Sequence, residues 1–263
     1  MAALFAVSAL LLAYALLWIA FSALPSNYVD SLIPRFRTAL NFIQIFSEDA
    51  LARPFLNTLL VSLAAALLTP LLVLPAARAL SGAGTGLKAA AFAIAQALGA
   101  AGGMHSLVPL YAMARAAGLL DTYIPLLFVN LFHAAPFALF TATAFLERLP
   151  RSAEEAAELD GASPATRLFR ITLPLALPSL AAGAMAAFLS AWNSFLAPLV
   201  LLNDDSMFTI GVRLYSYVGS VASGSPKWNR FAAASVVNLV AIGAVMLRAR
   251  GSLGSDAAAH QDD

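Results

Sequence analysis

The chain contains Glu155-Ala156-Ala157, then Gly161 after three residues, then Ile171-Thr172-Leu173-Pro174 after nine more. This spaced pattern lies in a polar segment, residues 147–174, of an otherwise apolar sequence. An ionised side chain at the middle of a bilayer costs roughly 2.5–3.5 kcal/mol, so the segment must lie outside the lipid. A polar element of this kind on a membrane protein indicates a docking partner. Its charged residues are Glu147, Arg148, Arg151, Glu154, Glu155, Glu158, Asp160, Arg167 and Arg170.

The composition indicates a helical membrane protein. Of 263 residues, 61% are hydrophobic and 11% are charged, and the mean hydropathy is +0.82. A soluble domain has about 25% charged residues. The formal net charge of +1 gives no electrostatic basis for nucleic-acid binding. The absence of cysteine excludes disulfides, thiolate metal sites and cysteine nucleophiles.

A membrane-spanning helix needs about 20 mostly apolar residues. Six stretches meet this requirement, so we predict an all-α membrane protein with six transmembrane helices and both termini on one side. Residues 1–250 would form the transmembrane domain, and the small, polar residues 251–263 are expected to be a disordered cytoplasmic tail. The predicted spans are residues 2–24, 55–80, 87–114, 123–146, 175–202 and 231–247.

Prolines and glycines mark special positions within these spans. Proline removes a backbone donor and bends a helix, and such bends serve either packing or gating, with packing the favoured reading. Gly99 and Gly103 have the small-xxx-small spacing that lets two membrane helices approach closely. The prolines are Pro70, Pro75, Pro136 and Pro178.

Capping signals predict two short helices in the polar segment. Ser152 and Glu155 form a capping box, which predicts a helix over residues 153–160. Gly161 suits the left-handed position that ends a helix. Ser163 and Pro164 then fit an N-cap and the first helical position, which predicts a second helix to about residue 172. These signals alone leave two alternatives, a docking element or a solvated loop stabilised by its caps.

The same residues carry a resemblance to a known family. The spaced pattern fills every position of the EAA loop of permease subunits of binding-protein-dependent ABC importers. Residues 118–123 (Gly-Leu-Leu-Asp-Thr-Tyr), 191–195 (Ala-Trp-Asn-Ser-Phe) and 53–58 (Arg-Pro-Phe-Leu-Asn-Thr) resemble segments of its carbohydrate, MalG-like branch. The similarity covers roughly residues 50–250.

The resemblance implies a type I importer permease in the inner membrane of a bacterium, embedded in lipid and importing a sugar or a sugar-like solute. It implies three protein partners: a second permease, a dimer of cytoplasmic ABC ATPases and an extracytoplasmic solute-binding protein. The helix around Glu155 would be the coupling helix that docks on an ATPase. The residues expected to couple to the ATPase are Glu154, Glu155, Ala156, Ala157, Glu158, Asp160, Gly161, Ala162, Ile171, Leu173 and Pro174.

We expect the chain itself to have no enzymatic activity and to bind no cofactor. Residues 82–88 (Gly-Ala-Gly-Thr-Gly-Leu-Lys) are glycine-rich, but a phosphate-binding loop needs Gly-x4-Gly-Lys-Ser/Thr. Leu87 stands where the second glycine belongs, and Ala89 follows the lysine in place of a hydroxyl residue. We therefore interpret the segment as a flexible turn and expect ATP to be bound and hydrolysed by a partner.

Two further groups of residues are candidate contact sites. Polar residues within spans suggest a function but also serve hydrogen bonds between helices, which is the favoured reading for each of them; packing is favoured for Trp192. The cavity candidates are Gln96, Asn130, His133, Trp192 and Asn193. In the outer loop, which the resemblance places against the binding protein, the candidates are Asp204, Asp205, Tyr215, Tyr217 and Gly219.

Two other classes of function compete with the importer permease. A secondary, ion-coupled transporter of small solutes usually has carboxylates within its spans, whereas every Asp and Glu here falls in a loop, at a span end or in the tail. An intramembrane enzyme needs a catalytic arrangement of residues, and none is evident within the spans. The secondary transporter is the alternative that we retain.

Overall fold

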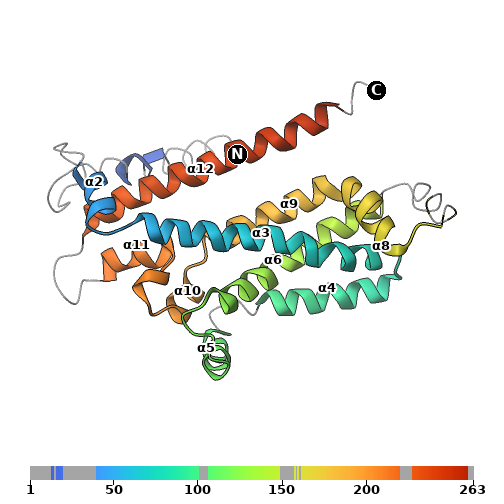
Figure 1. Cartoon of the computed structure of the whole chain (residues 1–263), viewed down its shortest axis with the longest axis horizontal. Helices are drawn as coiled ribbons and strands as arrows, with labels where there is room; N and C mark the ends of the chain where they lie inside the picture. Colours follow the sequence, from blue (N-terminus) through green and yellow to red (C-terminus); the bar gives the residue numbers. More distant parts are fainter. Residues whose placement is uncertain are drawn as a thin grey trace. The chain divides into compact units, whose positions relative to one another are not determined.

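The structure, a computed structural model, describes residues 13–14, 16–19, 40–100, 106–148, 157, 159, 161–219 and 227–259. Every regular element in these ranges is helical, which confirms the all-α class (Figure 1). The predicted first span lies almost entirely outside the described residues. The elements are α2 (Leu40–Ser47), α3 (Ala52–Ser81), α4 (Thr85–Gly99), α5 (Leu107–Ala116), α6 (Tyr123–Leu146), α8 (Pro164–Arg167), the π-helix η3 (Leu168–Thr172), α9 (Leu173–Trp192), α10 (Leu196–Leu201), the 3₁₀-helix η4 (Asp205–Met207), α11 (Ile210–Gly219) and α12 (Trp228–Ala259).

Within the described residues, four helices are long and apolar enough to cross a membrane. They are Ala52–Ser81, Tyr123–Leu146, Leu168–Trp192 and Trp228–Arg248, and they correspond to the predicted second, fourth, fifth and sixth spans. Within the predicted third span, 87–114, the structure describes α4 of 15 residues and α5 of 10 residues, and residues 101–105 between them lie outside the described residues. Each is shorter than the roughly 20 residues that a span needs.

Two predicted boundaries also differ from the structure. The fifth span was expected to run to residue 202, but α9 ends at Trp192 and α10 is a separate short helix. Hydropathy does not register the break because apolar residues continue on both sides of it. At the C-terminus, α12 is helical through Ala259, where the sequence predicts disorder; three consecutive alanines at 257–259 favour a helix.

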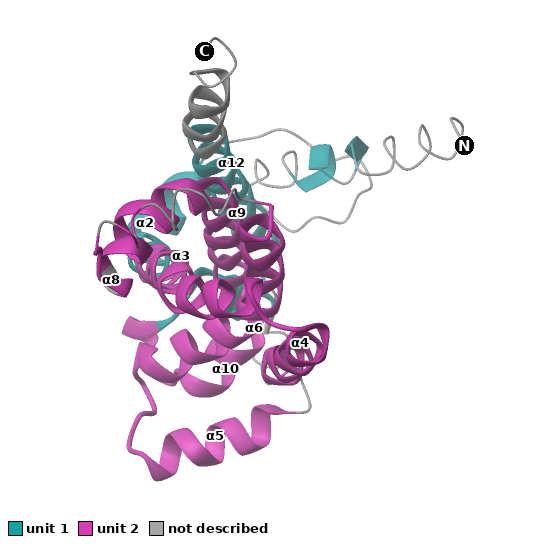
Figure 2. Cartoon of the chain, turned by 90° about the vertical axis from the view of Figure 1, so that its right-hand side faces the viewer, with its two compact units in different colours: residues 1–56, 208–263 teal, residues 57–207 magenta. Residues whose placement is uncertain are grey.

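The chain divides into two compact units (Figure 2). Unit 1 comprises residues 1–56 and 208–263, and unit 2 comprises residues 57–207. Unit 2 has α6 at its centre, because α6 packs against both α4 and α9. Its core consists of apolar residues from α3, α4, α6 and α9: Val73, Leu74, Ala77, Leu80, Ala95, Ala138, Leu139, Ala142, Leu146, Ala176 and Leu180.

Small residues bring the helices of unit 2 together. A Cβ atom at Gly99 would lie 2.8 Å from Cγ of Pro136, so α4 and α6 touch at this glycine. A Cβ atom at Gly183 would lie 3.0 Å from the Cβ of Ala138, so α9 approaches α6 equally closely. The packing role predicted for Gly99 is confirmed, whereas Gly103 lies outside the described residues. Membrane helices associate through close packing of this kind, because lipid provides no hydrophobic driving force between them.

Unit 1 is built from α2, α11 and α12, with residues of the short turn that follows α2. Ile45, Leu51, Ile210, Tyr217 and Ala232 to Ala234 form its core. Arg230, near the start of α12, pairs with two carboxylates of the turn after α2. Its Nη1 lies 2.9 Å from Oδ1 of Asp49, and its Nη2 pairs with Glu48. Arg230 and Asp49 are largely buried, with side chains 18% and 12% exposed.

The surface of α3 carries an apolar stripe. Leu60, Leu63, Leu67 and Leu71 are all exposed, and their spacing of three and four residues places them on one face of the helix. An exposed stripe of this kind is expected on a helix that faces lipid or another membrane subunit.

Candidate functional site

Residues 147–174, which the sequence predicts to couple to an ATPase and which are called the coupling loop below, have a well-formed turn at Gly161. Gly161 adopts φ +75°, the left-handed conformation that favours glycine. The N–H of Ala162 donates to the carbonyl of Ala157 at 2.9 Å, which is the closing hydrogen bond of a Schellman helix end. The prediction that a helix ends at Gly161 is therefore confirmed at its C-terminal boundary.

Most of the first predicted helix of this loop lies outside the described residues. Of that helix, only Ala157 and Leu159 are described, and both are helical. The Leu159 side chain is 89% exposed. The coupling candidates Glu154, Glu155, Ala156, Glu158 and Asp160 lie outside the described residues, as do Ser152 and its capping box.

The second half of the loop begins as predicted but does not end as predicted. The Ser163 hydroxyl accepts the N–H of Thr166 at 3.2 Å, so Ser163 caps α8. The helix then continues without a break through η3 into α9, where the sequence predicts a separate helix ending near residue 172. The N–H of Leu173 donates to the carbonyl of Leu168, five residues back. This wider π turn immediately precedes Pro174, which has no N–H to donate, and the chain remains helical through it.

Residues of η3 and the start of α9 attach the loop to the rest of unit 2. Leu168 and Leu173 pack against its core, Ile171 is half-buried, and Pro174 is exposed. Beside them lies a cavity of about 330 Å³ lined by Pro75, Arg78 and Ala79 of α3 and by Pro164, Arg167, Leu168 and Thr172. At the same end of α6, Nζ of Lys88 lies 2.5 Å from Oε1 of Glu147, which joins the start of α4 to the end of α6. The coupling loop is thus anchored on helical neighbours.

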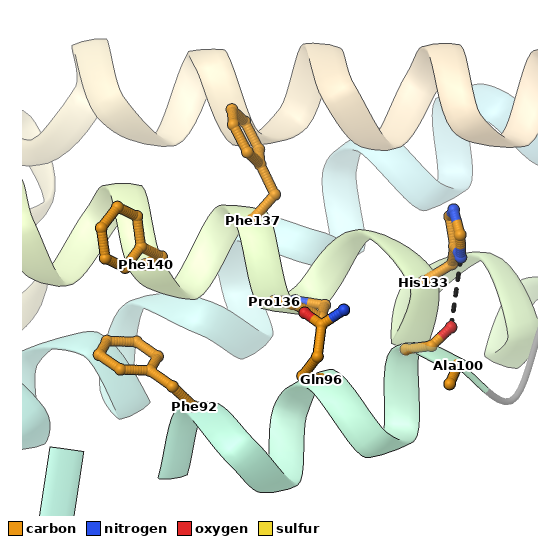
Figure 3. A pocket seen from close by; sticks show the side chains of 8 residues that line it. Phe92, Gln96, Ala100, His133, Pro136, Phe137 and Phe140 are labelled. Carbon is orange, nitrogen blue, oxygen red and sulfur yellow. Dashed lines mark hydrogen bonds between the residues drawn. The ribbon is translucent and has the colours of Figure 1, made fainter. Parts of the chain in front are cut away.

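Two of the five cavity candidates come together. Gln96 of α4 and His133 of α6 line a cavity of about 560 Å³ (Figure 3). The Nδ1 atom of His133 lies 3.2 Å from the carbonyl oxygen of Gly99, and this contact orients the imidazole ring. The Phe92 and Phe140 rings meet edge to face at 5.6 Å between centroids. The remaining lining residues are Gly99, Ala100, Pro136 and Phe137. This cavity therefore combines aromatic walls with an amide and an imidazole.

The other three cavity candidates lie elsewhere. Asn130 is buried, and its amide donates to the Leu126 carbonyl of its own helix at 2.9 Å. Trp192 is buried and stacks on Phe188 with ring centroids 5.4 Å apart. Asn193 is exposed at the C-cap of α9 and donates to Leu189 at 2.9 Å. In this structure the amides of Asn130 and Asn193 thus bond carbonyls of the helices that carry them.

The outer-loop candidates fall in both units. In unit 2, Asp204 and Asp205 are exposed. In unit 1, Tyr215 is 49% exposed, Gly219 ends α11, and Tyr217 is buried in the core. Burial, together with the nearby carboxylate of Asp49, raises the pKa of the Tyr217 phenol above its usual value. The Tyr217 carbonyl accepts the N–H of Lys227 at 3.0 Å.

Sequence reasoning missed Asp121 as a functional residue. The segment 118–123 carried the family resemblance, but the role of its aspartate was not predicted. In the structure, Oδ1 of Asp121 accepts the N–H of Asn203 at 2.5 Å and that of Asp204 at 3.0 Å. These bonds, with Asn203 the stronger contributor, lower the pKa of Asp121 below its usual value. The one signal in the sequence was an aspartate in a turn that begins with glycine.

The described residues contain no group of three or more His, Asp or Glu side chains that could hold a metal ion. Residues 82–84 form the turn between α3 and α4, where the sequence predicts a turn.

Comparison with known proteins identifies the family. Residues 48–249 match the family described as "Binding-protein-dependent transport system inner membrane component". A putative ABC transporter permease protein, ORF1, of Streptomyces antibioticus is 35% identical over 207 residues, which are 79% of this chain and 90% of that protein. The trehalose transport system permease protein SugB of Mycobacterium tuberculosis is 30% identical over 244 residues, which are 90% of this chain and 89% of that protein.

The fold is also found among solved structures. A chain of a bacterial ABC transporter involved in the import of the acidic polysaccharide alginate matches with a TM-score of 0.72. The match covers 94% of this chain and 92% of that chain, at 22% sequence identity. At this identity the similarity concerns the fold alone.

The chain therefore belongs to the family of inner-membrane components of binding-protein-dependent transport systems, and it is a multi-pass membrane protein. The family resemblance stated from residues 155–174 is confirmed by this match, which includes them. Within the family, the chain is a permease subunit of an ABC importer, related to permeases of sugar transport systems.

Proposed function

We propose that the chain forms half of the translocation pathway of an ATP-driven importer of a sugar or a sugar-like solute. The observation that carries the proposal is the family match over residues 48–249. Relatives named for trehalose transport and for sulfoquinovosyl glycerol transport support the solute class. The partners would be a second permease, a dimer of cytoplasmic ATPases and an extracytoplasmic binding protein. The retained alternative, a secondary transporter, receives no support from these relatives.

The coupling loop would dock on the ATPase. Its helix ends in a glycine-dependent turn, and Leu159 presents an exposed apolar side chain beside that turn. An apolar side chain in this position suits a cleft on a partner protein. The Ser163 cap and the packing of Leu168 and Leu173 would hold the loop rigidly enough to transmit movement. ATP would be bound by the partner and not by this chain.

The cavity at Gln96 and His133 would line the solute pathway. Both side chains are exposed on the surface of unit 2, and His133 lies near the middle of the 24-residue helix α6. Polar groups at this depth usually face a water-filled cavity or another subunit and not lipid tails. An amide and an imidazole can hydrogen-bond sugar hydroxyls, while the aromatic walls suit the apolar face of a sugar ring.

Co-purification from native membranes tests the proposal. Purification of the chain should bring a second permease, an ATPase and a binding protein, and a sugar screen on that binding protein should identify the solute. Isolation of the chain without an ATPase, together with uptake driven by an ion gradient, would refute the proposal.

Substitutions in the cavity test the pathway assignment. In reconstituted vesicles, Gln96→Leu and His133→Leu should each reduce sugar uptake roughly 3- to 10-fold, about the effect of losing one hydrogen bond. Thr141→Val is the matched control, because the Thr141 hydroxyl bonds the Phe137 and Ala138 carbonyls of its own helix. Uptake by both cavity variants equal to that of the control would remove these residues from the pathway.

A further inference from the structure

Asp121 has a backbone conformation that an aspartate adopts only at a cost. Its φ is +56°, in the left-handed region where residues other than glycine are disfavoured. Glycine would adopt this backbone conformation without that cost. What aspartate adds to the turn between α5 and α6 is its carboxylate side chain. Residues held in such conformations cluster at functional sites.

That side chain connects the turn to a segment some 80 positions away. In addition to the two N–H groups that its carboxylate accepts, Asp121 donates its own N–H to the Leu201 carbonyl at 3.1 Å. One residue thus makes three hydrogen bonds to residues 201–204. Hydrogen bonds to an ionised carboxylate are shorter and stronger than neutral ones.

The receiving segment, residues 202–207, is held by two more side chains. The Asn57 amide of α3 donates to the Ser206 carbonyl at 2.9 Å, and the Tyr123 hydroxyl of α6 donates to the Met207 carbonyl at 3.2 Å. Within the segment, the Asp204 carboxylate accepts the N–H of Ser206 at 2.8 Å. Segment 202–207 is therefore fixed to α3, to the α5–α6 turn and to the first residue of α6.

The position of Asp121 makes this attachment mechanically important. Asp121 precedes α6 by two residues, and α6 runs unbroken for 24 residues to Leu146, immediately before the coupling loop. A helix of this length spans about 36 Å. At its far end, Glu147 pairs with Lys88. The outer segment and the coupling loop are thus attached to opposite ends of one continuous, packed helix.

We propose that Asp121 is the positioning residue through which segment 202–207 moves α6, so that docking of the binding protein on the outer side reaches the coupling loop. This inference rests on the proposed function. Segment 202–207 contains Asp204 and Asp205 of the predicted outer loop, where the binding protein would dock. Displacement of the segment pulls on Asp121 and Tyr123 together, and the packed helix α6 carries the displacement to Glu147.

Three substitutions separate the carboxylate from the backbone strain. Asp121→Gly removes the carboxylate but favours the left-handed conformation. Asp121→Ala removes the carboxylate and keeps the strain, and Asp121→Asn keeps an acceptor oxygen in place. Thr122→Val is the matched control, because the Thr122 hydroxyl bonds only the Leu119 carbonyl of the same turn among the interactions described here.

The experiment uses the whole importer, with its partner permease, ATPases and binding protein, in vesicles. The readout is the ratio of ATPase rates with and without sugar-loaded binding protein. In Asp121→Gly and Asp121→Ala this ratio should fall at least 5-fold, whereas Asp121→Asn and Thr122→Val should keep most of it. Hydrogen exchange at the Asn203 and Asp204 amides should accelerate at least 10-fold in the glycine and alanine variants.

The results distinguish this inference from the proposed function. If the binding protein fails to stimulate the wild-type ATPase, the proposed function itself is wrong. If stimulation occurs and Asp121→Gly retains it, the Asp121 carboxylate does not transmit movement from segment 202–207 to α6, and the inference is overturned. Equal losses of basal and stimulated rates in Asp121→Gly, in a complex that purifies intact, would assign Asp121 a purely structural role and also overturn it.

Discussion

The turn at Gly161 provides a quantitative test of the coupling loop. Gly161 has φ +75°, and a residue with a Cβ atom pays roughly 1–2 kcal/mol to adopt the left-handed conformation. A Cβ atom at this position would meet nothing within 4 Å, so the cost arises from the backbone alone and not from a steric clash with a neighbour. Between 1 and 2 kcal/mol corresponds to a 5- to 30-fold change in an equilibrium.

This cost sets an order for a series of substitutions. Gly161→Asn should have the smallest effect, because asparagine tolerates this conformation. Gly161→Ala should lower the equilibrium constant for forming the native loop about 5-fold, and Gly161→Val should lower it about 30-fold because its side chain is branched at Cβ. If the loop docks on the ATPase only in its native form, the dissociation constant rises in the same order, by at most these factors.

The assay is binding of the partner ATPase to the permease in lipid nanodiscs, together with sugar uptake in vesicles. Gly84→Ala is the matched control, because Gly84 has φ −70° and its added Cβ atom would also meet nothing within 4 Å. Equal ATPase affinity and equal uptake in Gly161→Val and wild type would refute the reasoning. So would a loss in Gly84→Ala as large as the loss in Gly161→Val.

Three further outcomes are expected. Gly99→Ala should lower the thermal unfolding midpoint by an amount equivalent to about 1–3 kcal/mol, because the new Cβ atom would lie 2.8 Å from Cγ of Pro136. Gly243→Ala is the control, because a Cβ atom at Gly243 would meet nothing within 4 Å. Arg230→Met should cost roughly 2–3 kcal/mol in the same measurement, since it leaves the largely buried Asp49 without its cation, and an unshifted midpoint would argue against that pair. The purified chain alone should show no saturable binding in a titration with a fluorescent ATP analogue.

Local chemistry made part of this structure predictable. The positions of α6 and of the turn at Gly161 follow from a long apolar run and from the conformational freedom of glycine. Hydropathy averaging did not distinguish α4 from α5 within the predicted third span, because both helices are apolar. The same averaging concealed the end of α9 at Trp192.

The candidate site was predictable in composition more than in geometry. Gln96 and His133 were selected as polar residues in apolar helices, and they share a cavity. Asn130 was selected for the same reason, yet its amide bonds its own helix, a choice that depends on the rotamer and not on the sequence. The role of Asp121 depends on backbone N–H groups more than 80 positions away, which no local pattern indicates.

The two glycine contacts on α6 restrict how unit 2 can move. With Gly99 against Pro136 on one neighbouring helix and Gly183 against Ala138 on the other, neither neighbour can slide along α6 without driving backbone into side chain. We therefore expect α4, α6 and α9 to move together in a transport cycle. Bending between such a group and its neighbours is then expected in the connections between helices, such as residues 193–195 after α9.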